Sequence, residues 1–229
     1  MKKITFTNIS DYVDLEVPKP ASRYIPEWYK EMQSYMNGNR QPMGNGSTSA
    51  TMKKCMPVFD AITSGYIIEL PADVYVSQRD GEPWYEWSLF EMIKFHAVEQ
   101  APSHPKRNGM PQYPKFTNLW SIETPPGYSC LFVQPFHREA AFTILPGIVD
   151  TDSYTPPVNF PFVLNDRNFE GIIPKGTPIA QVIPFKRDSW EINIGDKKNF
   201  NKQISIAYKI NQTFFDAYKN LFWNKKEYK

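Results

Sequence analysis

Between residues 119 and 194 the sequence alternates short apolar runs with turn residues, and this pattern constrains the fold more than any other feature. The runs are Trp120–Ile122, Ser129–Gln134, Phe142–Ile144, Val158–Val163, Ile179–Phe185 and Trp190–Ile194. Glycine, proline, aspartate or asparagine separates each run from the next. Many short strands with frequent turns are typical of an antiparallel barrel or sandwich. The 21 prolines and the 15% aromatic content favour the same architecture over long helices.

The segments before residue 119 are less uniform. We expect a short strand at Ile4–Ile9 and a helix that begins at Pro26, because proline suits the first helical turn. The apolar residues expected on the buried face of that helix are Trp28, Met32, Tyr35 and Met36. Residues 37–49 have the composition of a loop, and residues 52–76 are predicted to be β, with short extended runs at 66–70 and 74–76.

Residues 77–118 contain many turn signals, among them Asp80-Gly81, and predict an irregular insertion with a strand near 91–98. The tail predicts an amphipathic helix whose apolar residues are Phe214, Phe215, Tyr218, Leu221 and Phe222. The predicted organisation is therefore an N-terminal extension at 1–50, a β barrel at 51–195 with its insertion at 77–118, and a C-terminal helical extension at 196–229.

Composition excludes several classes of protein. A hydrophobic content of 41% and a charged content of 22% describe a soluble globular chain, and a net charge of +2 indicates no nucleic-acid partner. No apolar run is long enough to span a membrane, and the N-terminus does not resemble a signal peptide. Cys55 and Cys130 are expected to be buried free thiols, which suits the cytoplasm.

Four segments, in order, share one pattern of motifs. They are Pro125–Tyr128, Gly147–Asp152, Phe162–Asn165, and Phe169 followed by Ile173–Ile183; Ser64-Gly65-Tyr66 adds a weaker match. These segments resemble motifs of the dUTPase/dCTP-deaminase superfamily, in which the third motif reads GVIDxDY and the fourth GDRIAQLI. Residues 51–187 also resemble uncharacterised tailed-phage proteins that carry the strings GIVDTDSY and KGTPIAQVIPFKR. The resemblance implies a mainly β chain, with a dUTPase-like β-clip barrel and added N-terminal and C-terminal helices.

The resemblance also implies a site. Asp150 corresponds to the aspartate that orients or deprotonates the attacking water in a dUTPase. Asp152 lies two residues further on, so the two carboxylates are candidate ligands for Mg²⁺. The competing interpretation is that both aspartates cap a turn before Pro156-Pro157, and without partners elsewhere we favour it. The remaining candidate ligand-binding residues are Tyr154, Gln181, Arg138, His137 and Gly176.

Several positions that a dUTPase uses are replaced. Residues that correspond to its phosphate, metal and base ligands have become Ile67, Phe136, Ser153, Thr177 and Pro178. The change of the second-motif arginine to phenylalanine removes a bidentate phosphate ligand. The Gly-rich C-terminal arm of the family is missing as well. Ordinary dUTP hydrolysis is therefore not expected.

Three functions remain open at this point. The first is a phage-type accessory or structural β-clip protein without dUTPase activity, assembled as a homotrimer, in the host cytoplasm or on the virion. The second is a protein that binds or sequesters a nucleotide. The third is a Mg²⁺-dependent nucleotide pyrophosphatase with Asp150 at the water-activating position. The loss of the phosphate ligands favours the first.

Overall fold

The chain divides into two compact units, which are described separately. The computed structural model describes residues 2–11, 14–41, 43, 49–100, 112–195, 200–213 and 216–229. Met1–Ala21 and Gly65–Arg187 form one unit, called here the β unit, and Ser22–Ser64 and Asp188–Lys229 form the other, called here the helical unit. The chain passes from one unit to the other after Ala21, Ser64 and Arg187, whereas the predicted divisions lie at residues 50 and 195. Chain segments from both ends of the sequence therefore contribute to the helical unit.

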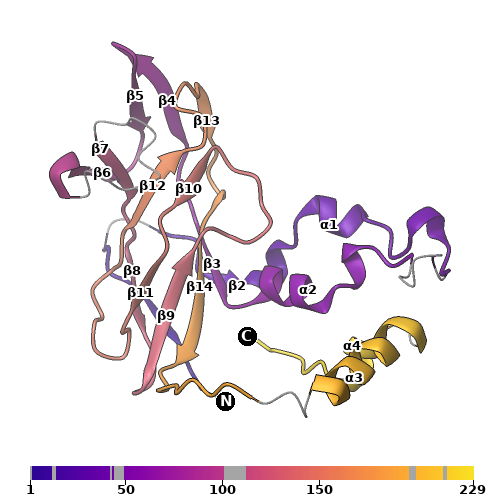
Figure 1. Cartoon of the computed structure of the whole chain (residues 1–229). Coiled ribbons are helices and arrows are strands. Elements are labelled where there is room, and N and C mark those ends of the chain that lie inside the picture. The colour runs from indigo at the N-terminus through magenta and orange to yellow at the C-terminus, as the bar shows by residue number, and fades with distance from the viewer. Residues whose placement is uncertain are drawn as a thin grey trace. The chain divides into compact units, whose positions relative to one another are not determined.

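Antiparallel sheets make up the β unit (Figure 1). The largest contains β11 (Gly147–Val149), β9 (Tyr128–Val133), β14 (Pro178–Lys186), β3 (Tyr66–Glu69) and β2 (Lys19–Pro20), in that order. A second sheet contains β10 (Phe142–Ile144), β12 (Phe160–Leu164), β7 (Gln112–Phe116) and β6 (Ile93–Ala97). A three-stranded sheet contains β13 (Gly171–Ile173), β4 (Val74–Arg79) and β5 (Glu82–Trp87), in that order. A two-stranded sheet pairs β1 (Thr5–Asn8) with β8 (Trp120–Glu123).

The mainly β prediction is confirmed. Every ladder between these strands is antiparallel. Helical turns lie near both ends of the chain, as expected from a dUTPase-like β fold with added helices. Five of the six strand runs predicted between residues 119 and 194 coincide with β8, β9, β10, β12 and β14, because alternation and turn residues specify strands locally.

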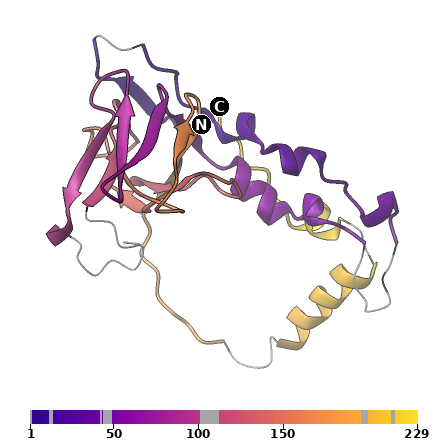
Figure 2. The same cartoon turned by 90° about the horizontal axis from the view of Figure 1, so that it is seen from above.

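The sixth run, Trp190–Ile194, is not a strand. The structure assigns it no regular element, and its three apolar side chains are 88–90% exposed. In Figure 2 the segment follows β14 as an extended coil. Alternating apolar residues predict a strand only where a neighbouring strand and an apolar surface receive them, and the described residues of one chain supply neither.

The predicted irregular insertion is more regular than expected. Strand β4 runs on to Arg79 and turns through Asp80 and Gly81 into β5, so these strands form a two-residue hairpin. Both turn residues have positive φ, 52° and 77°, which is the geometry that Asp-Gly favours. Strands β6 and β7 follow and join the second sheet. The strand expected near residues 91–98 is confirmed as β6.

Aromatic side chains form the centre of the β core. Phe162 is fully buried, and its ring stacks on Phe116 with centroids 4.1 Å apart. Phe142 and Tyr85 meet the same ring edge-on at 5.7 and 5.9 Å. Such pairs each add about 0.5–1.5 kcal/mol beyond the area they bury. The four rings come from four different strands and tie β4–β5 to the second sheet.

The helical unit corrects two predictions about the N-terminal half of the chain. Residues 52–76 were expected to be β, but Met56–Thr63 forms α2, with Pro57 in its first turn. Helix α1 (Glu27–Glu31) has only five residues, and it buries Tyr29 at 3% exposure while Trp28 is 38% exposed. A single short turn cannot present the four-residue face expected there, and Met36 is likewise exposed. Tyr29 packs on Phe59 of α2.

The predicted tail helix consists of two helices. They are α3 (Phe200–Thr213) and α4 (Ala217–Leu221). Asp216 has φ of 74°, which no continuous right-handed helix contains. Phe214 and Phe215 lie outside the described residues. Beyond α4, Trp223 and Lys226 both bind the Asp60 carboxylate, with Nε1 and Nζ at 3.0 and 2.6 Å.

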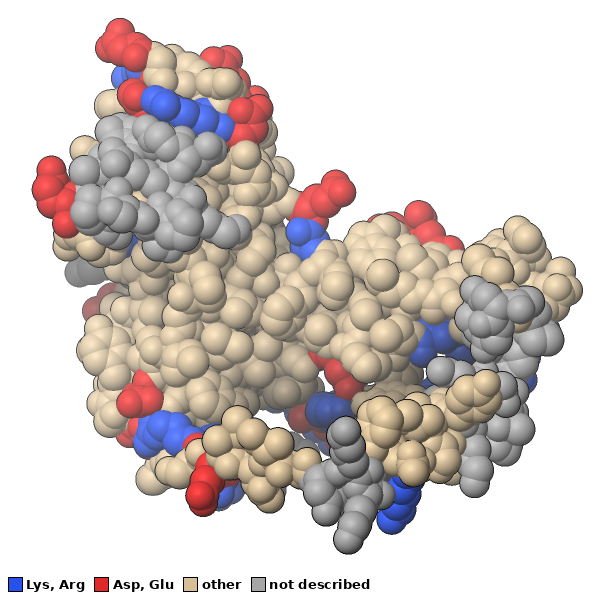
Figure 3. Space-filling model, in the orientation of Figure 1, with Lys and Arg blue, Asp and Glu red and all other residues tan. Residues whose placement is uncertain are grey.

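Two further predictions concern the thiols and the membrane. Cys130 is fully buried, as expected, and burial raises the pKa of its thiol to about 11. Cys55 is half-buried. Within the described residues, no helix combines the length and apolar character needed to cross a bilayer. Figure 3 shows acidic and basic side chains interspersed over the face that it presents.

Candidate functional site

The two aspartates singled out in the sequence lie in a tight turn directly after β11. The Ser153 and Tyr154 amides donate to the Asp150 carbonyl at 3.0 and 2.8 Å, which closes the turn. Thr151 lies between the aspartates and is fully buried. Asp150 is 60% exposed, whereas Asp152 is only 9% exposed. The turn thus points one carboxylate to solvent and the other against the β unit.

Arg187, at the end of β14, binds the buried carboxylate. Its Nη1 donates to Asp152 Oδ1 at 2.8 Å, and its Nη2 donates to Asp152 Oδ2. This is the two-armed geometry that a guanidinium and a carboxylate prefer. The Gly127 amide donates to Asp152 Oδ2 at 2.8 Å. Both oxygens of Asp152 therefore already accept hydrogen bonds from the protein.

The second carboxylate belongs to the same cluster. Ser129 Oγ donates to Asp150 Oδ1 at 2.7 Å, and Arg187 Nη1 lies 3.1 Å from that oxygen. Arg187 Nη1 also donates to Ser129 Oγ at 3.1 Å. We call Ser129, Asp150, Asp152 and Arg187 the aspartate–arginine cluster. It joins the end of β11 and the end of β14 to the start of β9.

The cluster shifts the pKa values of its members. The hydrogen bonds from Arg187, followed by the one from the Gly127 amide, lower the pKa of Asp152 to about 2. The bond to Asp152 raises the pKa of Arg187. Both groups therefore stay charged at every physiological pH. A carboxylate held in this way is a poor general base, because its charged form is stabilised.

A cation would have to displace Arg187 to reach the oxygens of Asp152. The hydrogen bonds also differ from the predicted capping of the turn before Pro156-Pro157, because Asp152 accepts from the Gly127 amide in another turn and the Asp150 side chain binds Ser129 and Arg187. In the described parts of the chain, no three His, Cys, Asp or Glu side chains lie close enough together to hold a metal ion. Magnesium bound by Asp150 and Asp152 stays a prediction.

Gln181 lies away from the aspartates within one chain. It pairs with Val133 in the β14–β9 ladder, whereas Asp150 binds Ser129, four residues away along β9. At about 3.4 Å per residue, that separation is roughly 14 Å. Gln181 is 1% exposed, and its Oε1 accepts from the Phe136 amide at 3.0 Å. Its described role is to fix the loop after β9.

The other predicted ligand-binding residues lie in three places, namely the loop after β9, the turn into β14 and the aspartate turn. His137 and Arg138 belong to the loop that Gln181 holds; His137 is exposed with φ of 56°. Gly176, with φ of 81°, turns the chain into β14, and its amide donates to the Leu70 carbonyl at 2.8 Å. Tyr154 is 50% exposed beside the aspartates. One chain therefore does not gather the predicted residues into a single pocket.

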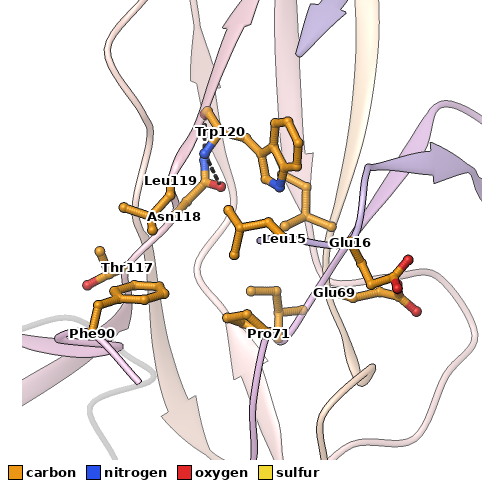
Figure 4. Close-up of a pocket in the computed structure, with 11 residues that line it drawn as sticks. Leu15, Glu16, Glu69, Pro71, Phe90, Thr117, Asn118, Leu119 and Trp120 are labelled. Atoms are coloured by element: carbon orange, nitrogen blue, oxygen red, sulfur yellow. Dashed lines mark hydrogen bonds between the residues drawn. The ribbon is translucent and has the colours of Figure 1, made fainter. Parts of the chain in front are cut away.

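A cavity in the β unit lies elsewhere, and sequence reasoning did not find it (Figure 4). Its lining comprises Leu15, Glu16, Ile68, Glu69, Pro71, Phe90, Thr117, Asn118, Leu119, Trp120 and Ile179. Lys19 Nζ lies 2.8 Å from Glu16 and 3.9 Å from Glu69, so it offsets one of the two carboxylate charges at the cavity. The volume of about 20 Å³ holds a water molecule. Nucleotide-sized ligands need hundreds of cubic ångströms.

Two residues of the cluster, Arg187 and Ser129, are not among the site residues predicted from the sequence. Arg187 follows the predicted strand Ile179–Phe185 as the second of two basic residues, which is a common and uninformative context. Its pairing with Asp152 depends on the β14–β9 ladder, in which Lys186 lies opposite Tyr128. No local signal specifies that register.

Comparisons with known proteins add little to this site. No protein-family model matches the chain, and no curated protein matches it either. Among solved structures, a mutant dUTPase of Staphylococcus bacteriophage 80alpha with dUpNHpp superposes over 85% of this chain and 88% of that one. The TM-score is 0.37 and the identity 12%. At this level of likeness, neither an activity nor a ligand follows for the present chain.

The low pKa of Asp152 predicts an acid-dependent loss of stability. Since its folded-state pKa lies below the ordinary value of 3.8, the pairing stabilises the fold above about pH 4, and this contribution is lost as pH falls towards 2. Asp152→Asn should flatten the decline in the free energy of unfolding between pH 4 and 2. Urea titrations over this range measure it. Asp80→Asn, in an exposed turn, is the matched control and should keep the wild-type slope; equal slopes for all three proteins would contradict the pairing.

Proposed function

We propose that this chain is a phage-type accessory or structural protein without dUTPase activity, assembled from several copies of itself as a trimer. The observation that carries the proposal is the two-armed pairing of Arg187 with Asp152. A magnesium site on both aspartates needs open oxygens on Asp152, and both of these are already bonded, while Oδ1 of Asp150, at the water-activating position, is held by Ser129 and Arg187. The phage attribution rests on the resemblance of the GIVDTDSY and KGTPIAQVIPFKR strings.

The composition of the site supports the same proposal. A triphosphate requires several converging cations or amides, since its charge is otherwise poorly compensated. The position of the second-motif arginine is Phe136, and Arg187 already has two carboxylate partners. The first-motif position is Ile67, which is fully buried in β3 and cannot reach a ligand. Each replacement removes binding as well as transition-state stabilisation.

Nucleotide assays test the proposal directly. We expect no pyrophosphate release from dUTP with Mg²⁺, and no change in Tm with any common nucleotide. A ligand at a hundred times its Kd would add about 2.7 kcal/mol of stability, which corresponds to roughly 5–10 °C for a chain of this size. Either turnover or a shift of that magnitude would overturn the proposal.

The nucleotide-binding alternative has one observation in its favour, because the Asp150 side chain is 60% exposed next to a half-exposed Arg187. A nucleotide could reach both groups, and Mg²⁺ could reach the Asp150 carboxylate, without unfolding the turn. Under this alternative, a Tm shift that requires Mg²⁺ would disappear in Asp150→Ala. A shift that survives in Asp150→Ala but needs Gln181 would place the ligand at the other end of β14.

A further inference from the structure

The excess of basic residues in this chain lies in the helical unit. Residues 22–64 and 188–229 contain 13 Lys and Arg against 8 Asp and Glu, whereas the β unit contains 13 against 16. The helical unit therefore carries a net charge of +5 and the β unit one of −3. Residues 200–229 hold six of the lysines and only two acidic residues. A basic excess concentrated in this way attracts anionic partners.

Helix α3 presents apolar side chains to solvent. Each residue from Phe200 to Tyr208 is exposed. Phe200, Ile204 and Tyr208, at 58%, 46% and 62% exposure, recur every four residues and so share one side of the helix. Lys202, two residues after Phe200, lies on the opposite side. A helix of 14 residues is only marginally stable alone in water, so this apolar side needs a surface that receives it.

A second set of exposed apolar side chains lies in and directly after α4. Trp223 Nε1 donates to the Asp60 carboxylate of α2 at 3.0 Å, which anchors the chain just beyond α4. Tyr218, Leu221 and Phe222 stay 42%, 66% and 46% exposed, and their spacing of three and four residues places them on one side of the turn. The anchor thus holds the segment on α2 while its apolar side faces solvent.

We propose that α3 and α4 bind the surface of an anionic lipid bilayer, with their apolar side chains among the headgroups and their lysines in the field of the lipid charges. The helices lie along the surface, because no helix among the described residues can cross a bilayer. Helices of this kind carry aromatic and aliphatic residues on one side and lysines on the other, as α3 does. The inference goes beyond the proposed function and depends neither on the number of copies nor on the absence of dUTPase activity.

The residue types favour lipid over nucleic acid as the anionic partner. Residues 188–229 contain no arginine, the side chain that grips a phosphate with two parallel hydrogen bonds. Ile204 and Leu221 are aliphatic and provide no ring on which a base stacks. Lysine acts as a point charge, which suits the diffuse field of a lipid surface.

Sedimentation of the full chain with lipid vesicles tests the inference. Vesicles of three parts phosphatidylcholine to one part phosphatidylserine should bind the protein at least about tenfold more tightly than vesicles of phosphatidylcholine alone, because each lysine near an anionic surface contributes about fivefold. Raising NaCl from about 0.1 M to about 1 M should remove the difference, since the Debye length falls from about 10 Å to about 3 Å. No binding to the anionic vesicles at the lower salt concentration would overturn the inference.

Substitutions on the apolar side of α3 test its role. Phe200→Ser/Ile204→Ser/Tyr208→Ser should lower the affinity for anionic vesicles on the order of a hundredfold, because three side chains no longer bury apolar surface in the bilayer. Phe200→Leu/Ile204→Leu/Tyr208→Leu keeps the apolar character and should retain the wild-type affinity within about threefold. An equal loss in the leucine variant would contradict insertion into lipid, which accepts apolar side chains of any shape.

A matched variant in the β unit controls for the loss of apolar surface in general. Tyr75→Ser/Trp84→Ser/Ile172→Ser removes three side chains that are 44–52% exposed on the β13–β4–β5 sheet. This protein should bind the anionic vesicles as the wild type does. If it loses as much affinity as the serine variant of α3, the assignment to the helical unit is wrong.

The lysines are tested in the same assay. Lys202→Gln/Lys219→Gln should weaken binding to the anionic vesicles about tenfold or more. Lys94→Gln/Lys175→Gln removes the same charge from the β unit and should leave the affinity within about twofold of wild type. Equal effects of the two pairs would mean that overall charge, and not the helical unit, draws the protein to the vesicles, and the inference would fail.

A single-stranded DNA oligonucleotide is the competing ligand. We expect it to bind more weakly than the anionic vesicles and to displace little protein from them. Tighter binding of the oligonucleotide, lost in the serine variant of α3, would assign these helices to nucleic acid and would overturn the choice of lipid.

Discussion

Phe162→Ala is expected to lower the free energy of unfolding of the β unit by about 3–5 kcal/mol, the usual range for a buried phenylalanine. The side chain is fully buried and contacts three aromatic rings, Phe116, Phe142 and Tyr85, so the cavity left behind would be lined by large side chains from several strands. Such side chains collapse incompletely, which adds a cavity cost to the lost transfer energy.

Urea unfolding followed by far-UV CD measures the effect of that substitution. Phe95→Ala is the matched control, because Phe95 also contacts Tyr85 but is 45% exposed. It should cost about 1 kcal/mol or less. Phe162→Leu should recover most of the loss, since it refills much of the volume. A cost for Phe162→Ala no larger than that of the control would mean that these rings are not the centre of the core.

Gly65→Ala is expected to destabilise the β unit by about 3 kcal/mol or more, through two separate causes. Gly65 has φ of +70°, which is unfavourable for a residue with a Cβ atom. A Cβ atom there would also lie 2.0 Å from the Val182 carbonyl oxygen, and the backbone of β14 cannot move away without disrupting its two ladders.

A second glycine substitution separates the two causes. Gly81 has φ of +77°, but a Cβ atom there meets nothing within 4 Å. Gly81→Ala should therefore cost only about 1–2 kcal/mol, the penalty for positive φ alone. Equal losses for both variants in urea unfolding would contradict the predicted clash with β14. This contact also explains why Ser64-Gly65-Tyr66 needs its glycine, whatever the origin of the motif.

Short-range signals predicted the strands well. The Asp80-Gly81 turn, the runs at β8, β9, β10, β12 and β14, and the β1 strand at Thr5–Asn8 all follow from alternation, turn chemistry and β-branched or aromatic residues. The helices were harder, because α1 is a single short turn and α2 lies among residues with strand-like composition. In these segments tertiary packing of Tyr29 on Phe59 outweighs local propensity.

The chemistry open to the candidate site depends on which side chains bind the two aspartates, and no local sequence pattern reveals those partners. Asp150 and Asp152 are visible as a motif, but whether they bind a metal or cap a turn depends on which side chain reaches them. Arg187 reaches them because the β14–β9 register places residue 187 beside the turn. The same register keeps Gln181 away from them.

The amino-acid sequence by itself determined most of the strands and turns between residues 119 and 187, because these depend largely on residues within a few positions of one another. Only the tertiary structure decided that Arg187 holds Asp152, that Gly65 abuts Val182, and that Trp190–Ile194 finds no partner within the described chain. Each of these depends on strand order and register, which bring together residues more than thirty positions apart or leave them unpaired. Long-range pairing follows from burial of the whole core, and no short segment encodes it.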